Sequence, residues 1–312
     1  MTFKVIINTE LEAVNIAKIN DLQKWESGNV VRYENKETYK LSGIMISIVK
    51  NKVQIKCSLH KLYNKLMTGT LENSGLFTIT EARRELYTLF DKIGLEAERA
   101  RITYFEIGLN IPTNDEPIKY IELMKSITTG KASTTTKEMF NDANFRKNRQ
   151  KTTEKAKTIK KYFKVYDKGF EMSDRKRTEP TDEKILRIET VYRRQSVYVP
   201  EFFKPDNIDR ITRTFYKDWA GVEFERKVTA DKGTRQSEIA NAEKILSLGR
   251  ENYLQIIRTE LQDEKITAKQ YRTIREFIRD WDVNKHKYKL LPSECETEYK
   301  EKLRYWFELA KY

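Results

Sequence analysis

Alternating hydrophobic and polar residues predict a β-hairpin near the start of the chain. The segment Tyr39–Tyr63 contains two alternating runs on either side of Lys50-Asn51-Lys52. Alternation with a period of two is typical of a half-buried strand, and Asn51 tolerates the positive φ that a tight turn needs. We expect the two runs to pair and His60 to lie on the second strand.

A helix is predicted after this hairpin. Thr80 is expected to cap its first turn, and Gly94 is expected to end it. Its apolar residues recur at helical spacing and are Leu86, Leu89, Phe90 and Ile93.

Three further strands are predicted at Arg101–Ile111, Thr158–Asp167 and Lys184–Tyr192. The first ends at Pro112, which has no amide hydrogen to donate to a neighbouring strand. Residues 128–157 are rich in Thr, Lys and Asn, which indicates a loop followed by a polar helix.

From about Ser237 the hydrophobic period becomes helical. We expect three helices, within residues 238–264, 266–281 and 296–312. Thr267 can cap the second, and the short connection before it is compatible with a helix-turn-helix arrangement. A helical bundle that packs on the sheet or mediates self-association fits the pattern equally well.

These elements predict an α+β fold. We expect a central, mainly antiparallel, five-stranded sheet with helices on its apolar face, followed by a helical C-terminal region. The expected domains are residues 1–230 and 231–312, the second with a possible role in DNA binding or oligomerisation.

Composition favours a folded protein of the cytoplasm. The chain has 312 residues, of which 38% are hydrophobic and 11% aromatic, more than a disordered chain would carry. The longest apolar run, Gly43–Val49, is too short to span a membrane, and the first residues do not resemble a secretory leader. Cys57 and Cys295 match no zinc or disulfide spacing, and the only histidines are His60 and His286.

The positive charge is concentrated in one segment. Of the net charge of +13, residues 145–177 supply +9, from thirteen basic and four acidic side chains. Such a patch favours a polyanionic partner, because each neutralised phosphate releases counterions. A solvated, flexible basic connector would have the same composition.

One face of the predicted sheet carries side chains that could bind a metal ion or take part in catalysis. Because strand residues alternate between faces, we expect five polar residues to share the face opposite the apolar one: His60, Glu106, Tyr166, Lys168 and Glu189. Two carboxylates and an imidazole can hold Mg²⁺ or Mn²⁺, and a cation beside a tyrosine favours its ionisation. A solvent-facing side of an ordinary sheet would also look polar.

At these residues the chain resembles the rolling-circle replication initiators of plasmids and single-stranded DNA phages. This resemblance covers roughly residues 39–194. The matching segments occur in the family's order and are IKCSLHKLYN (Ile55–Asn64), ITYFEIGLNI (Ile102–Ile111), FKVYDKGFE (Phe163–Glu171) and ILRIETVYRR (Ile185–Arg194).

The resemblance implies a role for each residue. Tyr166 would be the nicking nucleophile and Lys168 its cationic neighbour, while His60, Glu106 and Glu189 would bind the divalent metal. Residues expected to contact DNA are Lys160, Lys161, Lys164 and Arg187.

Two features depart from the family or leave its assignments open. The broader nickase class often has two histidines separated by one residue, whereas this chain reads Ser58-Leu59-His60, so a purely structural His60 is an alternative. Tyr162, in the same row as Tyr166, and the more distant Tyr192 are rival nucleophiles.

The implied activity is nicking of one DNA strand at an origin. It would leave a 5′-phosphotyrosine link and a free 3′-OH for a host polymerase. The chain has no P-loop motif, so a separate host helicase is expected as well. The alternatives are a non-catalytic DNA-binding accessory protein, in which the basic segment makes the contacts, and a conjugative relaxase with the same chemistry.

Overall fold

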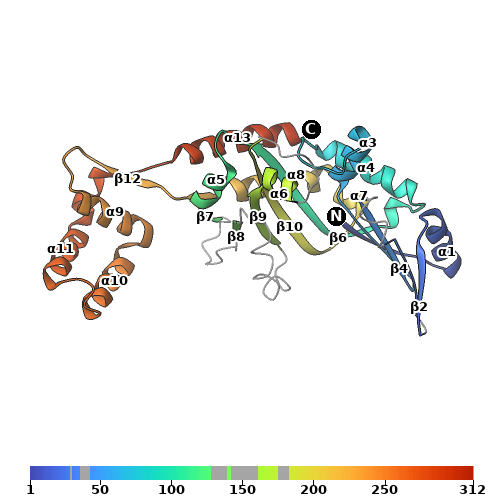
Figure 1. Cartoon of the computed structure of the whole chain (residues 1–312), viewed down its shortest axis with the longest axis horizontal. Helices are drawn as coiled ribbons and strands as arrows, with labels where there is room; N and C mark the ends of the chain where they lie inside the picture. The colour runs from blue at the N-terminus through green and yellow to red at the C-terminus, as the bar shows by residue number, and fades with distance from the viewer. Residues whose placement is uncertain (29, 36–42, 128–138, 142–160, 175–182, 312) are drawn as a thin grey trace. The chain divides into compact units, whose positions relative to one another are not determined.

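A computed structural model describes residues 1–28, 30–35, 43–127, 139–141, 161–174 and 183–311 (Figure 1). By its packing the chain divides into two compact units. The first comprises Met1–Glu223 and Glu298–Tyr312, and the second comprises Phe224–Thr297.

The first unit is built on one large sheet. Its strands, in spatial order, are β2 (Gln23–Ser27), β3 (Val30–Glu34), β4 (Ile44–Val49), β5 (Lys52–Cys57), β1 (Thr2–Ile6), β6 (Arg101–Pro112), β10 (Ile185–Tyr198), β9 (Lys161–Asp167) and β8 (Met139–Asn141). Only β8 and β9 pair in parallel; the other described pairs are antiparallel. The fold is therefore α+β.

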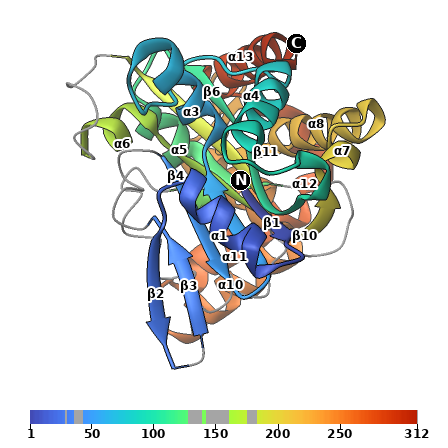
Figure 2. The ribbon, with the colours of Figure 1, turned by 90° about the vertical axis from the view of Figure 1, so that its right-hand side faces the viewer.

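The expectation of a five-stranded sheet is wrong, because this sheet has nine strands among the described residues. The four additional strands are β1, β2, β3 and β8. Strand β2 is exposed along its whole length and β3 along most of it, so neither has a clear alternation of buried and exposed positions. The other two are short: β1 has five residues and β8 has three. Figure 2 shows β2 and β3 at the outer edge of the sheet.

The predicted hairpin is confirmed as β4 and β5, with two corrections. The residue with positive φ in the turn is Lys50, at 55°, rather than Asn51. Strand β5 ends at Cys57, where the Ser58 side chain caps helix α3 (Leu59–Thr68). His60 therefore lies on a helix, because the hydroxyl of Ser58 satisfies a free amide of the first turn and stops the strand.

The first unit also contains helices. Besides α3 they are α1 (Glu10–Ile19), α4 (Ile79–Lys92), α5 (Pro117–Leu123), α6 (Lys168–Asp174), α7 (Val199–Phe202), α8 (Pro205–Ala220) and most of α13 (Glu294–Lys311), with a 3₁₀ turn, η1 (Ala97–Arg99). Two short strands, β7 (Met124–Ile127) and β11 (Val222–Phe224), form a separate pair.

The helix predicted after the hairpin is confirmed as α4, but Thr78 caps it instead of Thr80. The Thr78 hydroxyl accepts from the amide of Glu81, and the Glu81 carboxylate accepts from the amide of Thr78. This reciprocal pair satisfies two backbone donors, which a cap at Thr80 would leave open. The helix packs on the sheet through Phe90, whose ring meets Phe3 edge to face at 5.3 Å.

The two faces of β6, β9 and β10 differ as predicted. Helix α8 covers the apolar face: its Trp219 contacts Phe163 edge to face at 5.7 Å, and its indole donates a hydrogen bond of 3.0 Å to Thr190. Because strand residues alternate, Lys164, Glu189 and their neighbours in that row point to the opposite face.

The second unit contains three main helices and a two-stranded sheet. Its elements are β12 (Lys227–Ala230), α9 (Gln236–Leu248), α10 (Arg250–Gln262), α11 (Ala268–Arg279), α12 (Trp281–Asn284), the 3₁₀ turn η3 (Lys285–Lys287) and β13 (Tyr288–Leu291). Gly249, with φ at 82°, divides the single helix expected over 238–264 into α9 and α10. Thr267 caps α11 as predicted.

Within the described ranges, no helix has the length and apolar character needed to cross a membrane. Most of the basic segment 145–177, including Lys160, lies outside the described residues. The loop and helix expected at 128–157 also lie outside them, except for residues 139–141, which form β8.

Candidate functional site

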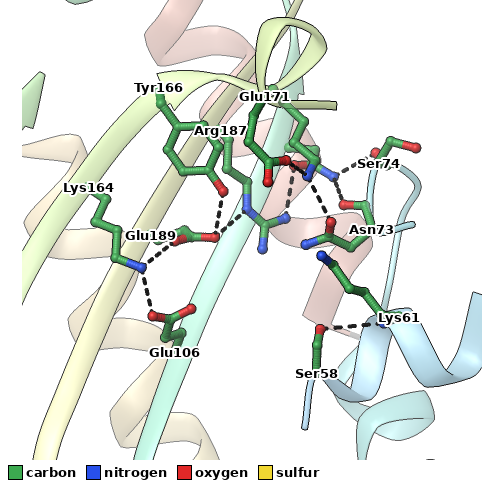
Figure 3. Close-up of polar contacts among 12 residues, drawn as sticks. Ser58, Lys61, Asn73, Ser74, Glu106, Lys164, Tyr166, Glu171, Arg187 and Glu189 are labelled. Carbon is green, nitrogen blue, oxygen red and sulfur yellow. Dashed lines mark hydrogen bonds and ion pairs between the residues drawn. The ribbon is translucent and has the colours of Figure 1, made fainter. Parts of the chain in front are cut away.

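Three side chains converge on the carboxylate of Glu189 (Figure 3). The Tyr166 hydroxyl and the Arg187 Nε each donate to its Oε1 at 3.0 Å, and the Lys164 ammonium donates to its Oε2 at 3.0 Å. The strand register explains the arrangement, because Arg187 pairs with Tyr166 and Glu189 pairs with Lys164 across β10 and β9. Directly opposed and diagonal residues on one face of a sheet are within reach of one another.

Glu106 joins this group through Lys164. The Lys164 ammonium lies 2.7 Å from Glu106 Oε1, so a single cation bridges two carboxylates. The hydroxyl of Tyr104 also donates to Glu106. Four of the polar residues considered above, Glu106, Lys164, Tyr166 and Glu189, therefore meet on one face of three adjacent strands.

The charges of this network stabilise one another. Burial alone would raise the pKa of Glu189, but the charges and hydrogen bonds of Lys164 and Arg187 lower it to about 2. Burial likewise opposes the charge of Lys164, yet Glu189 and Glu106 raise its pKa above the ordinary value. Both groups are ionised at neutral pH.

Tyr166 is held neutral in this environment. Its side chain is 5% exposed, and burial, followed by the negative charge of Glu189, raises the pKa of its phenol well above 10. The positive charge of Arg187 acts in the opposite direction. A nucleophilic Tyr166 would therefore have to lose its proton as it attacks, to a base already in contact with it.

Lys168 occupies a different position from the one expected. It lies in the first turn of α6, is 1% exposed, and bonds to Glu171 at 2.5 Å and to Asn73 Oδ1 at 2.8 Å. Burial lowers its pKa, although Glu171 opposes this. The cation directly across the sheet from Tyr166 is Arg187.

His60 is buried against an aromatic ring. Its side chain is 8% exposed, its ring stacks on Phe77 with 4.7 Å between centroids, and its Nε2 has no hydrogen-bond partner among the described residues. Burial, and then the charges of Arg187 and Lys168, lower its pKa to about 3, so the ring is neutral at physiological pH.

The three predicted metal ligands do not form one coordination group. Wherever the structure places side chains, no three of His, Cys, Asp or Glu come together in a way that could hold a metal ion. Glu106 and Glu189 do flank a common cation, the ammonium of Lys164. The donor set that fits a hard divalent cation is therefore this pair of carboxylates, without His60.

A cavity of about 900 Å³ borders the network. It lies where β1 stops pairing with β6, since the register of these strands extends only to Tyr104. Beyond that point the Asn110 side chain donates to the carbonyls of Asn73 and Ser74. The polar residues that line the cavity include His60, Asn73, Tyr104, Glu106, Arg187 and Glu189. His60 and both glutamates thus line the same cavity. Tyr166 is connected to this lining by its hydrogen bond to Glu189.

The predicted DNA-contacting residues within the described ranges all have acidic partners in the protein. Lys161 pairs with Asp218, Lys164 with both glutamates, and Arg187 with Glu189. Lys160 lies outside the described residues.

The rival tyrosines occupy distinct surroundings. The Tyr162 hydroxyl accepts a hydrogen bond of 3.0 Å from Arg193. The ring of Tyr192 stacks on Phe105 at 4.6 Å, which places it on the apolar face, away from the network.

Sequence reasoning assigned no role to several residues of the site. Tyr104 and Asn110 shared the polar row of β6, which was the available signal, whereas the contacts of Asn73 and Glu171 with Lys168 depend on a loop and a helix. Gly108 matters because a Cβ there would lie 2.5 Å from Arg187 Nη2.

No model of a known protein family matches this chain, and no curated protein matches its sequence.

Proposed function

We propose that this protein nicks one strand of DNA at a replication origin by attack of Tyr166. The observation that supports this most strongly is the hydrogen bond from the Tyr166 hydroxyl to Glu189, within a network that also contains Arg187, Lys164 and Glu106 beside a large cavity. It groups a nucleophile, a proton acceptor and cations that can hold a phosphate.

The reaction would be a transesterification. The Tyr166 oxygen attacks the phosphorus as its proton passes to Glu189, and the bond to the 3′ oxygen breaks. That oxygen takes up a proton and leaves as the free 3′-OH, while the 5′ phosphate stays on the tyrosine. A carboxylate with a pKa of about 2 is a weak base, so Glu189 alone would remove the Tyr166 proton poorly. Arg187 would therefore have to stabilise the negative charge that develops on the Tyr166 oxygen.

Glu106 and Glu189 would hold a Mg²⁺ or Mn²⁺ ion between them. Carboxylate oxygens are the ligands these cations prefer, and both groups are already oriented towards one cation. When bound, the ion would polarise a phosphoryl oxygen of the substrate. Lys164 would then shift from bridging the glutamates to neutralising phosphate charge.

A denaturing gel tests the proposal. Purified protein is incubated with Mn²⁺ and labelled single-stranded oligonucleotides from its own replicon, beside Tyr166→Phe, Glu106→Ala and the matched control Tyr162→Phe. We expect a covalent adduct with the wild type and Tyr162→Phe, none with Tyr166→Phe, and little with Glu106→Ala. An adduct that persists in Tyr166→Phe would refute the assignment of Tyr166 as the nucleophile.

The burial and raised pKa of Tyr166 favour a second candidate, a non-catalytic DNA-binding replication protein. In that case the buried network is structural. The same gel separates the two, since this candidate retards DNA on a native gel but gives no covalent adduct with any oligonucleotide.

A further inference from the structure

Helices α10 and α11 of the second unit are joined by a turn whose geometry is fixed at both ends. At the end of α10, Glu264 has φ at 58°, and the amide of Lys265 donates to the carbonyl of Glu260. This is the pattern of a Schellman cap. Thr267 and Gln270 then form a capping box that starts α11. Hydrogen bonds therefore define both ends of the connection between the two helices.

Helix α11 has one face in the core and one in solvent. Ile278 is buried, and Tyr271, Ile274 and Phe277 pack against the same cluster, which includes Ile257 of α10. On the other side Lys269, Arg272 and Arg275 are exposed, at helical spacing of three residues. Within the described part of the chain, no acidic side chain pairs with these three.

The positive charge of the three main helices is concentrated on α11. It carries four basic residues and one acidic residue, whereas α10 carries two of each and α9 carries one basic and two acidic residues. The difference, +3 against 0 and −1, arises mainly from the exposed face. A charge excess confined to one solvent-facing helix indicates a polyanion as its partner.

We propose that α11 is a recognition helix that binds the major groove of duplex DNA through Arg272 and Arg275. An α-helix with its side chains is about as wide as this groove, and a helix-turn-helix unit inserts its second helix there. Binding of single strands relies on exposed aromatic rings, but the aromatic residues of α11, Tyr271 and Phe277, pack against the core. This inference goes beyond the nicking activity and does not depend on it.

Fluorescence anisotropy of the full chain tests the proposal. The probe is a labelled DNA duplex with a randomised centre, titrated over a series of salt concentrations with the wild type, Arg272→Ala and Arg275→Ala. The control is Arg304→Ala, an exposed arginine of α13 that removes the same charge. We expect each α11 variant to bind about tenfold more weakly, with a salt slope reduced by about one, and Arg304→Ala to bind like the wild type.

Selection of duplexes from the randomised pool adds a readout of specificity. The wild type should enrich a defined sequence, and Arg272→Ala should relax it at particular positions. Unchanged melting temperatures ensure that the variants are folded. Duplex affinities and salt slopes that match the wild type would overturn the proposal. An equal loss of affinity for single-stranded DNA or double-stranded RNA would also overturn the assignment to duplex DNA.

The covalent-adduct assay on single strands, run with the same variants, keeps the two proposals apart. Loss of duplex binding by the α11 variants with intact adduct formation supports both. If the wild type forms no adduct but binds duplex DNA through α11, only the nicking proposal is refuted. If adducts form but the α11 variants bind duplex DNA like the wild type, only the proposal for α11 is refuted.

Discussion

The hydroxyl of Tyr166 donates a hydrogen bond of 3.0 Å to Oε1 of Glu189, so the state of the phenol depends on the charge of that carboxylate. Glu189 in turn compensates the charges of two cations, the buried Arg187 and the partly buried Lys164. The carboxylate therefore has a structural role whatever chemistry Tyr166 performs.

Glu189→Gln is expected to destabilise the protein strongly at neutral pH. It removes the negative charge between two cations with little access to water, and breaking a buried ion pair costs roughly 3–5 kcal/mol. Glu106→Gln is the matched control, because the Glu106 side chain is 32% exposed and its loss should cost about 1 kcal/mol or less. Urea unfolding measures both, and equal losses would contradict the role assigned to Glu189.

The same carboxylate gives stability a defined acid dependence. Its pKa is about 2 in the folded state, below the ordinary 4.5. Its contribution is therefore complete above about pH 4.5 and is lost as the pH falls towards 2. In Glu189→Gln that part of the acid limb should be absent, which chemical denaturation at several pH values would reveal.

His60 is expected to destabilise the fold at mildly acidic pH. Burial lowers its pKa from 6.5 to about 3, so the unfolded chain binds a proton between these values that the folded chain does not. Stability is complete above pH 6.5 and falls as the pH drops towards 3. His60→Phe keeps a ring against Phe77 and removes the titration.

This variant should gain stability relative to the wild type on acidification. Between about pH 8 and about pH 5 the relative gain should be roughly 2 kcal/mol. The test is denaturant unfolding of both proteins at the two pH values. A difference that does not change with pH would mean that His60 titrates normally in the folded protein.

Gly108 is expected to be required for the position of Arg187. A Cβ at residue 108 would lie 2.5 Å from Nη2 and 2.8 Å from Cζ of that arginine, whose Nε and Nη1 are bound to Glu189 and Asn110. Gly108→Ala must therefore displace a side chain that cannot move without breaking these bonds. Crowding of this kind costs typically 1–3 kcal/mol.

Gly75→Ala is the control for this substitution. Gly75 also lines the cavity, but a Cβ there meets nothing within 4 Å. Thermal unfolding should show a clear loss for Gly108→Ala and almost none for Gly75→Ala. Similar melting temperatures for the two variants would show that Arg187 adapts freely.

The sequence predicted which strand residues share a face better than it predicted the number of strands. Alternation along β6, β9 and β10 placed Glu106, Lys164, Tyr166 and Glu189 on one face, because a period of two leaves little freedom in a paired strand. The same pattern did not reveal β2 and β3, because these largely exposed strands have no clear alternation of buried and exposed positions.

His60 and Lys168 show where alternation fails as a guide. Each follows the end of a strand, where Ser58 starts one helix and Lys168 starts another. Once the chain becomes helical, the parity of a residue number no longer defines its face. Lys168 then pairs with Glu171, one turn further along the same helix, whereas the contacts with Phe77 and Asn73 depend on packing between separate segments. Local patterns do not encode such contacts.

Replacement of Lys164 should convert the two glutamates into a stronger cation site. In the wild type a divalent ion has to displace the ammonium that lies 2.7 Å from Glu106 and 3.0 Å from Glu189. In Lys164→Met the two carboxylates lose this partner and repel each other, which destabilises the protein and leaves their oxygens available. Mn²⁺ should then bind more tightly, and it should restore stability by about 3 kcal/mol at a hundredfold excess over its Kd.

Melting temperatures with and without Mn²⁺ measure this effect without reference to catalysis. Lys161→Met is the matched control, because Lys161 pairs with Asp218 rather than with the glutamates. It should lose some stability and gain no response to Mn²⁺. A Lys164→Met protein that does not respond to Mn²⁺ either would show that Glu106 and Glu189 do not hold a divalent cation, and the nicking proposal would then need a different source of metal assistance.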